Sequence, residues 1–152
     1  MDKIIQELLD EAIRLESNVA DLYFLYSKIF RDDREFWLKI ADEEMRHASL
    51  LRVVTDFVDF GSYIHDIIYA NLGELKQVNK DIKEKITQFK KESPSMEVAY
   101  KYAIALENGA YELHYQKLVT GTPNTQTLEA LQRLTGDDKD HADRITKLLK
   151  EK

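Results

Sequence analysis

Apolar side chains recur every three or four positions over four long stretches of the chain, which is the spacing of an amphipathic helix. The spacing predicts helices at about 2–30, 34–60, 95–119 and 124–150. The apolar positions of the first stretch are Ile5, Leu8, Ala12, Val19, Leu22, Tyr23 and Tyr26. Those of the second stretch are Trp37, Ile40, Ala41, Ala48, Leu51, Val54 and Val58. The pattern therefore predicts an all-α fold.

Two short connections and one long connection separate these helices. The short ones are the charged residues 31–34 and the Gly- and Pro-containing residues 121–124, and the long one is a crossover at 61–93. Within the crossover, residues 74–92 again show apolar side chains at helical spacing. We therefore expect the crossover to be largely helical.

The order of these connections indicates how the helices are arranged. Short connections within each helix pair and a long one between the pairs are typical of an antiparallel four-helix bundle with one crossover. Ser93 can cap the third helix, with Pro94 at its first helical position. A chain of this length is expected to form a single domain, residues 1–152.

The two halves of the chain resemble each other. LESNVADLYF at 15–24 aligns with LENGAYELHY at 106–115, and DEEMRHA at 42–48 aligns with GDDKDHA at 136–142. Two copies indicate a duplicated helix pair, because a solenoid needs three or more repeats.

Composition and charge narrow the classes of function. A net charge of −6 argues against nucleic acid or an anionic membrane as a partner. The sequence contains no transmembrane run, and its first helix is acidic and amphipathic, unlike a signal peptide. Because there is no Cys, the chain holds no disulfide, zinc–thiolate site or iron–sulfur centre. We expect a cytoplasmic protein.

Polar residues interrupt the apolar stripes at matching places in the two halves. Glu44 and His47 are three residues apart and so share one helix face, and Asp138 and His141 repeat that spacing. Each of the other two helices carries one Glu inside its stripe. The six residues predicted to face the core are Glu16, Glu44, His47, Glu107, Asp138 and His141.

Four carboxylates in one core need compensating charge. Desolvation and mutual repulsion would raise their pKa values and weaken the fold. Two divalent cations balance four negative charges, and the two imidazoles add one nitrogen ligand for each ion. An oxygen and nitrogen set without thiolate suits iron or manganese, with zinc as a common adventitious occupant. The pattern predicts a dinuclear metal site, half of which is held by Glu44 and His47.

This arrangement resembles the ferritin-like di-iron carboxylate proteins, and more closely their rubrerythrin-like branch. In that family two helices each give a Glu and the other two each give a Glu-x-x-His motif. The resemblance covers nearly the whole chain, in the segments AIRLESNVADLYFLYSKI, FWLKIADEEMRHASLLRVV, AYKYAIALENGAYELHYQKL and ALQRLTGDDKDHADRITKLL. It implies a ferritin-like fold, two iron ions (or Mn/Fe, Mn/Mn or adventitious Zn), a homodimer, and reduction of peroxide or O2.

Three departures from the family pattern affect the expected chemistry. Asp138 stands where the family usually has Glu, and its side chain is shorter by one methylene. The absence of Cys excludes a rubredoxin-type iron site in these residues, so turnover needs an external electron donor. The family also has a second carboxylate one turn from the ligand that matches Glu107. The corresponding neighbours here are Ala103, Ile104, Ala110 and Tyr111, which argues against peroxidase chemistry of the full rubrerythrin type.

The sequence leaves three functions open. The first is an oxidoreductase that reduces peroxide or O2 in oxidative-stress defence. The second is a ferroxidase or an iron-binding or storage protein. The third is a helical module, dimeric in solution, whose metals stabilise the fold without turnover.

Several residues near the predicted ligands keep two interpretations each. Asp137 or Asp140 competes with Asp138 for metal if the helix breaks at Gly136.

Tyr23, Tyr111 and His114 share the ligand faces, and each is either a core residue or a hydrogen-bond partner of a ligand. The lysines at 80–91 alternate with acids and are interpreted as a solvated helix face.

Overall fold

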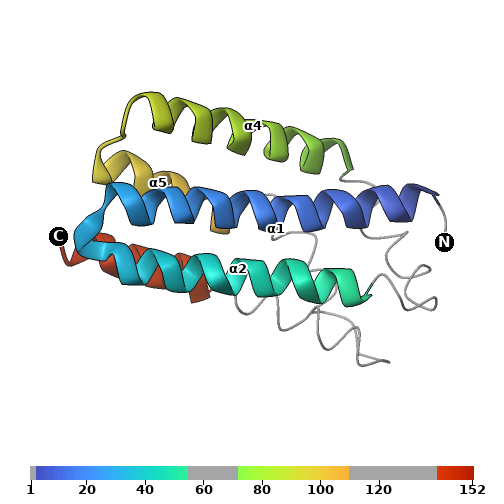
Figure 1. Ribbon diagram of the computed structural model, residues 1–152, viewed down its shortest axis with the longest axis horizontal. Helices are drawn as coiled ribbons and strands as arrows, with labels where there is room; N and C mark the ends of the chain where they lie inside the picture. The colour runs from blue at the N-terminus through green and yellow to red at the C-terminus, as the bar shows by residue number, and fades with distance from the viewer. Residues whose placement is uncertain (1–2, 55–71, 110–139) are drawn as a thin grey trace. The chain divides into compact units, whose positions relative to one another are not determined.

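The computed structural model (Figure 1) describes residues 3–54, 72–109 and 140–152. Within these ranges the chain is helical apart from short turns and no strand occurs, so the predicted all-α class is confirmed. The chain divides into two compact units, residues 1–93 and 94–152. The single domain predicted from the sequence stays a prediction.

The first unit is built on its N-terminal helix. Helix α1 (Lys3–Ile29) is followed by a 3-10 turn, η1 (Arg31–Asp33), and by α2 (Arg34–Val54). Helix α4 (Leu72–Lys91) belongs to the crossover. In Figure 1, α1 lies between α2 and α4 and contacts both; α2 runs antiparallel to α1 and α4 runs parallel to it. The first two predicted helices and the helical crossover are confirmed over the described residues.

Apolar and aromatic packing joins α1 to α2. The predicted stripes are buried: Leu8, Ala12, Val19, Leu22, Tyr23 and Tyr26 on α1, and Trp37, Ile40, Ala41, Ala48 and Leu51 on α2. The Trp37 ring centroid lies 5.2 Å from that of Tyr23 and 4.9 Å from that of Tyr26. Tilted and edge-on aromatic contacts of this kind add to the free energy gained from burial. The helix pair is thus held tightly at the end nearest η1.

A buried polar residue fixes α4 on α1. Leu75, Ile82 and Phe89 recur every seven residues and are buried, but Asn79 is buried among them. The Asn79 side-chain amide donates to the backbone oxygen of Glu11 (3.0 Å) and to its carboxylate (2.8 Å). The Asn18 amide donates in turn to Asn79 Oδ1 (3.0 Å). A satisfied buried amide sets the register between two helices, because any slip leaves its polar atoms unpaired.

The start of α5 (Met96–Glu107) in the second unit differs from the prediction. Ser95, and not Ser93, is the N-cap. Its backbone is extended, and its hydroxyl oxygen accepts a hydrogen bond from the Val98 backbone N–H at 3.3 Å. A hydroxyl at this position accepts a hydrogen bond from one of the backbone N–H groups that have no acceptor within the first turn of the helix.

The end of α5 also differs, since the apolar pattern predicted a helix that continues to 119. The chain turns after Glu107, and the Gly109 N–H donates to the Leu106 carbonyl at 3.1 Å. A Cβ at Gly109 would lie 2.9 Å from the Ala105 carbonyl oxygen, so a larger residue would strain this turn. Residues 110–139 lie outside the described ranges, and a helix occupies 140–150.

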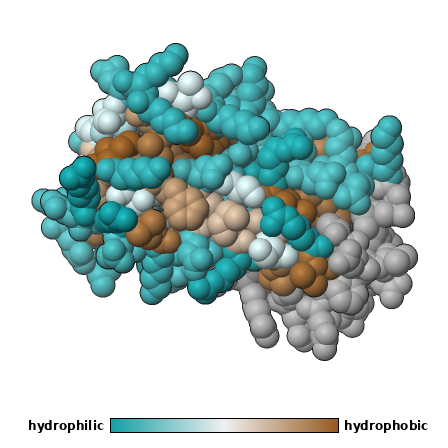
Figure 2. Space-filling model, viewed as in Figure 1, coloured by the Kyte–Doolittle hydropathy of each residue, from teal (hydrophilic) through white to brown (hydrophobic). Residues whose placement is uncertain are grey.

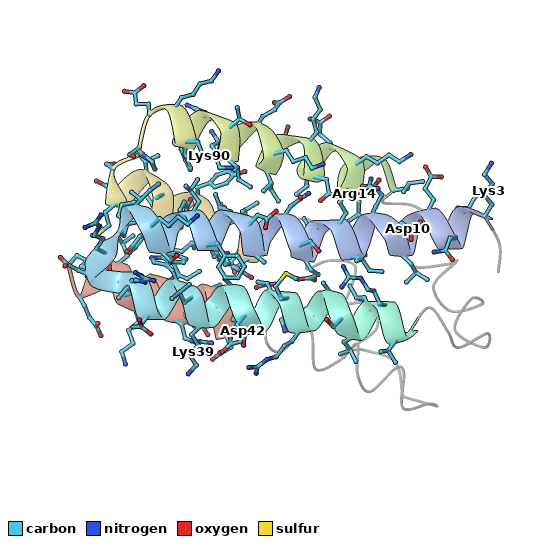
Figure 3. The ribbon with its side chains drawn as sticks, in the orientation of Figure 1. Lys3, Asp10, Arg14, Lys39, Asp42 and Lys90 are labelled. Atoms are coloured by element: carbon cyan, nitrogen blue, oxygen red, sulfur yellow. The ribbon has the colours of Figure 1, made fainter. Side chains whose placement is uncertain are left out.

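Hydrophilic side chains cover most of the face shown in Figure 2, with apolar surface visible between them. In Figure 3, the labelled Asp10 and Arg14 project from α1, and Lys39 and Asp42 project from α2. Among the described residues no helix is both long enough and apolar enough to cross a membrane.

We predict that Asn79→Leu destabilises the metal-free protein by roughly 1–3 kcal/mol, because the substitution leaves buried polar groups of Glu11 and Asn18 without their partner. The measurement is urea unfolding followed by circular dichroism. Gln77→Leu is the matched control on an exposed position of the same helix and should change stability by no more than about 0.5 kcal/mol. Equal effects of the two substitutions would contradict a register role for Asn79.

Candidate metal centre

The first set of candidate ligands lies where α1 faces α2. Glu16 projects from α1, and Glu44 and His47 project from α2 one turn apart. Their exposed fractions are 1%, 1% and 5%, so the predicted core-facing orientation of these three residues is confirmed. One donor atom from each residue lies within 4.8 Å of the other two. Two carboxylates and one imidazole are therefore gathered in a buried space.

The distances within this set are those of ligands around an ion. His47 Nδ1 lies 3.4 Å from Glu44 Oε2 and 3.7 Å from Glu16 Oε2, which is long for a hydrogen bond. Donor atoms that bind one ion at about 2.1 Å are separated from each other by roughly 3–4 Å. The second oxygen of Glu16 makes no hydrogen bond with any described residue. A divalent cation fits this donor set.

Electrostatics at the first set leads to the same conclusion. Burial and the neighbouring Glu44 carboxylate raise the pKa of Glu16 well above its usual value, against a smaller opposite effect of His47. Burial would by itself lower the pKa of His47, but the Glu16 and Glu44 carboxylates raise it to about 12. In the absence of another cation, the cluster therefore retains protons at neutral pH. A metal ion would replace those protons.

The second unit contains a related pair. Glu107 is the last residue of α5, and His141 lies on the helix at 140–150. Both are fully buried, with 3.8 Å between His141 Nδ1 and Glu107 Oε1. The duplicated halves of the sequence thus give one carboxylate–imidazole cluster in each unit. Asp138, the third predicted ligand of this half, lies outside the described residues.

Helix α5 carries only one buried carboxylate. The other acid on the helix, Glu97, is exposed and pairs with Lys101 at 2.6 Å. The buried positions before Glu107 include Tyr100 and Ala103, which carry no acid. The sequence indicated this difference from the family pattern.

The structure describes two of the remaining candidate residues near the ligands, Asp140 and Tyr23. Asp140 is exposed and bonds to Arg144 at 3.2 Å, away from the buried His141, which argues against Asp140 as a metal ligand. Tyr23 is fully buried and belongs to the aromatic cluster with Trp37. Asp137, Tyr111 and His114 lie outside the described ranges.

Trp37, which the sequence did not single out in relation to the ligands, joins Tyr23 beside the first set of ligands. Trp37 precedes Glu44 by seven residues, and Tyr23 follows Glu16 by seven, so both aromatic rings lie about two turns from the ligands on the same faces. The two rings are fully buried, and their centroids lie 5.2 Å apart between α1 and α2. The seven-residue spacing had already placed Tyr23 on the ligand face, and the same spacing from Glu44 was the signal that could have identified Trp37.

Comparison with known proteins gives one family. The family model described as Rubrerythrin matches residues 7–149, a range that includes all six predicted ligands. No curated protein and no solved structure matches the chain significantly.

The raised pKa of Glu16 gives a prediction for the metal-free protein. A raised pKa in the folded state stabilises the fold below about pH 4.5, and this contribution is lost as the pH rises toward the raised value. Glu16→Gln should match wild type near pH 5 and become the more stable protein at higher pH, by up to about 1.4 kcal/mol per pH unit. Urea unfolding at several pH values in the presence of chelator measures this difference.

The control for this experiment is Glu97→Gln, which alters an exposed carboxylate and should show no such growing difference. If the stability difference between Glu16→Gln and wild type does not change with pH, Glu16 is not a desolvated carboxylate in the metal-free fold.

Proposed function

The chain belongs to the rubrerythrin family, and we propose that it binds two iron ions and reduces peroxide or O2 with electrons from an external donor. The observation that carries the proposal is the buried cluster of Glu16, Glu44 and His47, in which a bound cation would replace the protons that the cluster otherwise retains. The pair of Glu107 and His141 supports a second ion. A cytoplasmic location and a homodimer stay predictions of the sequence.

In this proposal each half of the chain supplies the ligands of one ion. Glu16, Glu44 and His47 bind the first, Glu107, His141 and Asp138 bind the second, and Glu44 bridges the two. Support comes from donor chemistry, because carboxylate and imidazole without thiolate suit iron or manganese. Further support comes from the net charge of the sites, which two divalent cations neutralise.

Two ferrous ions held at these sites would supply the two electrons that, with two protons, convert one hydrogen peroxide into two waters. The residues of the chain hold the ions at fixed positions. The fully buried rings of Tyr23 and Trp37 pack between the same two helices about two turns from the first set of ligands. Because these 152 residues contain no Cys, they provide no thiolate-bound electron relay, and the proposal therefore includes an external electron donor.

A ferroxidase or iron-binding role is the second candidate. It is favoured by the single buried carboxylate on α5, since the family pattern has two acids on that helix. Under this alternative the protein would oxidise bound iron once and retain or release it.

Metal content tests the ligand assignment. We expect two metal ions per chain for wild type expressed with iron and manganese. His47→Ala and His141→Ala should each lose one ion, and Glu44→Ala should lose both because a bridging carboxylate serves both ions. Elemental analysis after desalting gives the count. Asp42→Ala, at an exposed position two residues before Glu44, is the control and should retain two ions. Two ions in Glu44→Ala would show that Glu44 is not a bridging ligand.

Reaction with peroxide tests the activity. Protein loaded anaerobically with Fe(II) should consume one peroxide for every two iron ions, followed by the near-ultraviolet absorption of ferric ions. With a chemical reductant present, peroxide consumption should continue for many turnovers. A single oxidation with ferric mineral accumulating would favour the ferroxidase alternative. Metal that raises the melting temperature but does not react with peroxide would indicate a structural role and contradict the proposal.

A further inference from the structure

A groove runs along the side of α1 that faces α4. The described residues that line it are Asn18, Asp21, Phe24, Leu25 and Lys28 on α1, and Lys83, Ile86, Thr87 and Lys90 on α4. Its volume is about 490 Å³. The apolar side chains of Phe24, Leu25 and Ile86 contribute to its lining, and Phe24 is 36% exposed. Apolar surface is thus open to solvent between two helices that are otherwise polar outside.

The groove is bordered by positive charge that forms no ion pair within the described part of the chain. Lys28, Lys83 and Lys90 are exposed, and none forms an ion pair with another described residue; Figure 3 labels Lys90 near the C-terminal end of α4. Some lysines elsewhere are paired, as Lys80 is with Glu84 and Lys101 with Glu97. Lys39 on α2 is exposed and unpaired among the described residues, but it does not line this groove, so the three groove lysines are distinguished by their place around an apolar centre.

Asp21 is the one acid among the described residues of the lining. A local excess of positive charge is notable in a chain whose net charge is −6. The alternation of lysines and acids along 80–91 concealed this excess, because the helix turns Asp81 and Glu84 away from the groove.

One end of the groove lies across a single helix from the first set of ligands, and the groove continues from there along α1 for roughly three turns, to Lys28. Asn18 lines the groove and bonds to Asn79 of α4, whereas Glu16, two residues earlier, faces Glu44 and His47 of α2. The distance across a helix with its side chains is about 10–12 Å. A redox group held over the Asn18 end of the groove would therefore be roughly one helix diameter from the ligands without entering the core.

We propose that this groove is the docking surface for the external electron donor, a small redox protein with an acidic surface. The inference rests on the proposed function, which requires electrons from outside the chain. Interfaces between redox proteins are small, and complementary charge governs how fast and how specifically they form. Unpaired lysines around a small apolar centre match a partner whose carboxylates surround its exposed cofactor.

The test uses binding, so that it does not depend on metal chemistry. An acidic flavodoxin is titrated into the isotope-labelled full chain loaded with diamagnetic, redox-inactive Zn(II), and NMR chemical shifts are followed. We expect the shift changes to map to residues 18–28 and 83–90, and the Kd to rise about tenfold between about 20 and 200 mM salt.

Matched charge reversals make the test specific. The triple variant Lys28→Glu, Lys83→Glu, Lys90→Glu should weaken binding at least tenfold, whereas Lys39→Glu, Lys80→Glu, Lys101→Glu changes the net charge equally and should weaken it no more than about twofold. Shift changes outside the groove, or equal losses in the two triple variants, would overturn the proposal. Binding of free flavin mononucleotide in the groove without binding of flavodoxin would assign the site to a small anion and also overturn it.

Failure of the docking surface and failure of the proposed peroxide activity give different results. If flavodoxin binds specifically at the groove but the iron-loaded chain does not react with peroxide, the docking surface is retained and the peroxide activity is rejected. Peroxide turnover with a chemical reductant, together with no binding at the groove, would retain the activity and reject the docking surface.

Discussion

Electrostatic repulsion between buried carboxylates is the constraint on which the molecule depends. Glu16 and Glu44 are almost wholly removed from water and lie within ligand distance of the same imidazole. Without a cation, such a cluster keeps protons at neutral pH and weakens the fold when it loses them. With a divalent ion, the same groups become a strong binding site whose binding energy stabilises the folded state.

The rest of the first unit holds these side chains at fixed positions. On one side the rings of Tyr23, Tyr26 and Trp37 join α1 to α2 near η1. On the far side of α1, the Asn79 network fixes the register of α4. Helix α1 therefore packs against a helix on each of two sides. Its side toward α2 carries the candidate ligand, and its side toward α4 borders the lysine-lined groove. The crossover helix thus supports the site without contributing a candidate ligand.

Much of the fold and part of the site could be predicted from the sequence, because helical periodicity reports which face is buried. The burial of Glu16, Glu44, His47, Glu107 and His141 followed from their places on apolar stripes. Helical periodicity does not predict features that depend on the hydrogen bonds of single residues. Asn79 is a polar residue within an apolar stripe, and its hydrogen-bond partners lie 61 and 68 positions away in the sequence. Helical spacing therefore could not identify them. The end of α5 depends on the turn at Gly109, although the apolar pattern continues beyond it. The sequence does not show which lysines lack an ion pair, because that depends on which acids pair with the neighbouring lysines in the fold.

The most direct test of the central claim is the free energy of unfolding measured against free metal concentration, with Mn(II) as an air-stable ion. If the fold depends on two cations that unfolding releases, stability should rise above the binding range by about 2.8 kcal/mol for each tenfold increase in free metal. The increase should be lost in Glu44→Ala. Stability that is independent of metal concentration would contradict the account, because the buried carboxylates would then be tolerated without a cation.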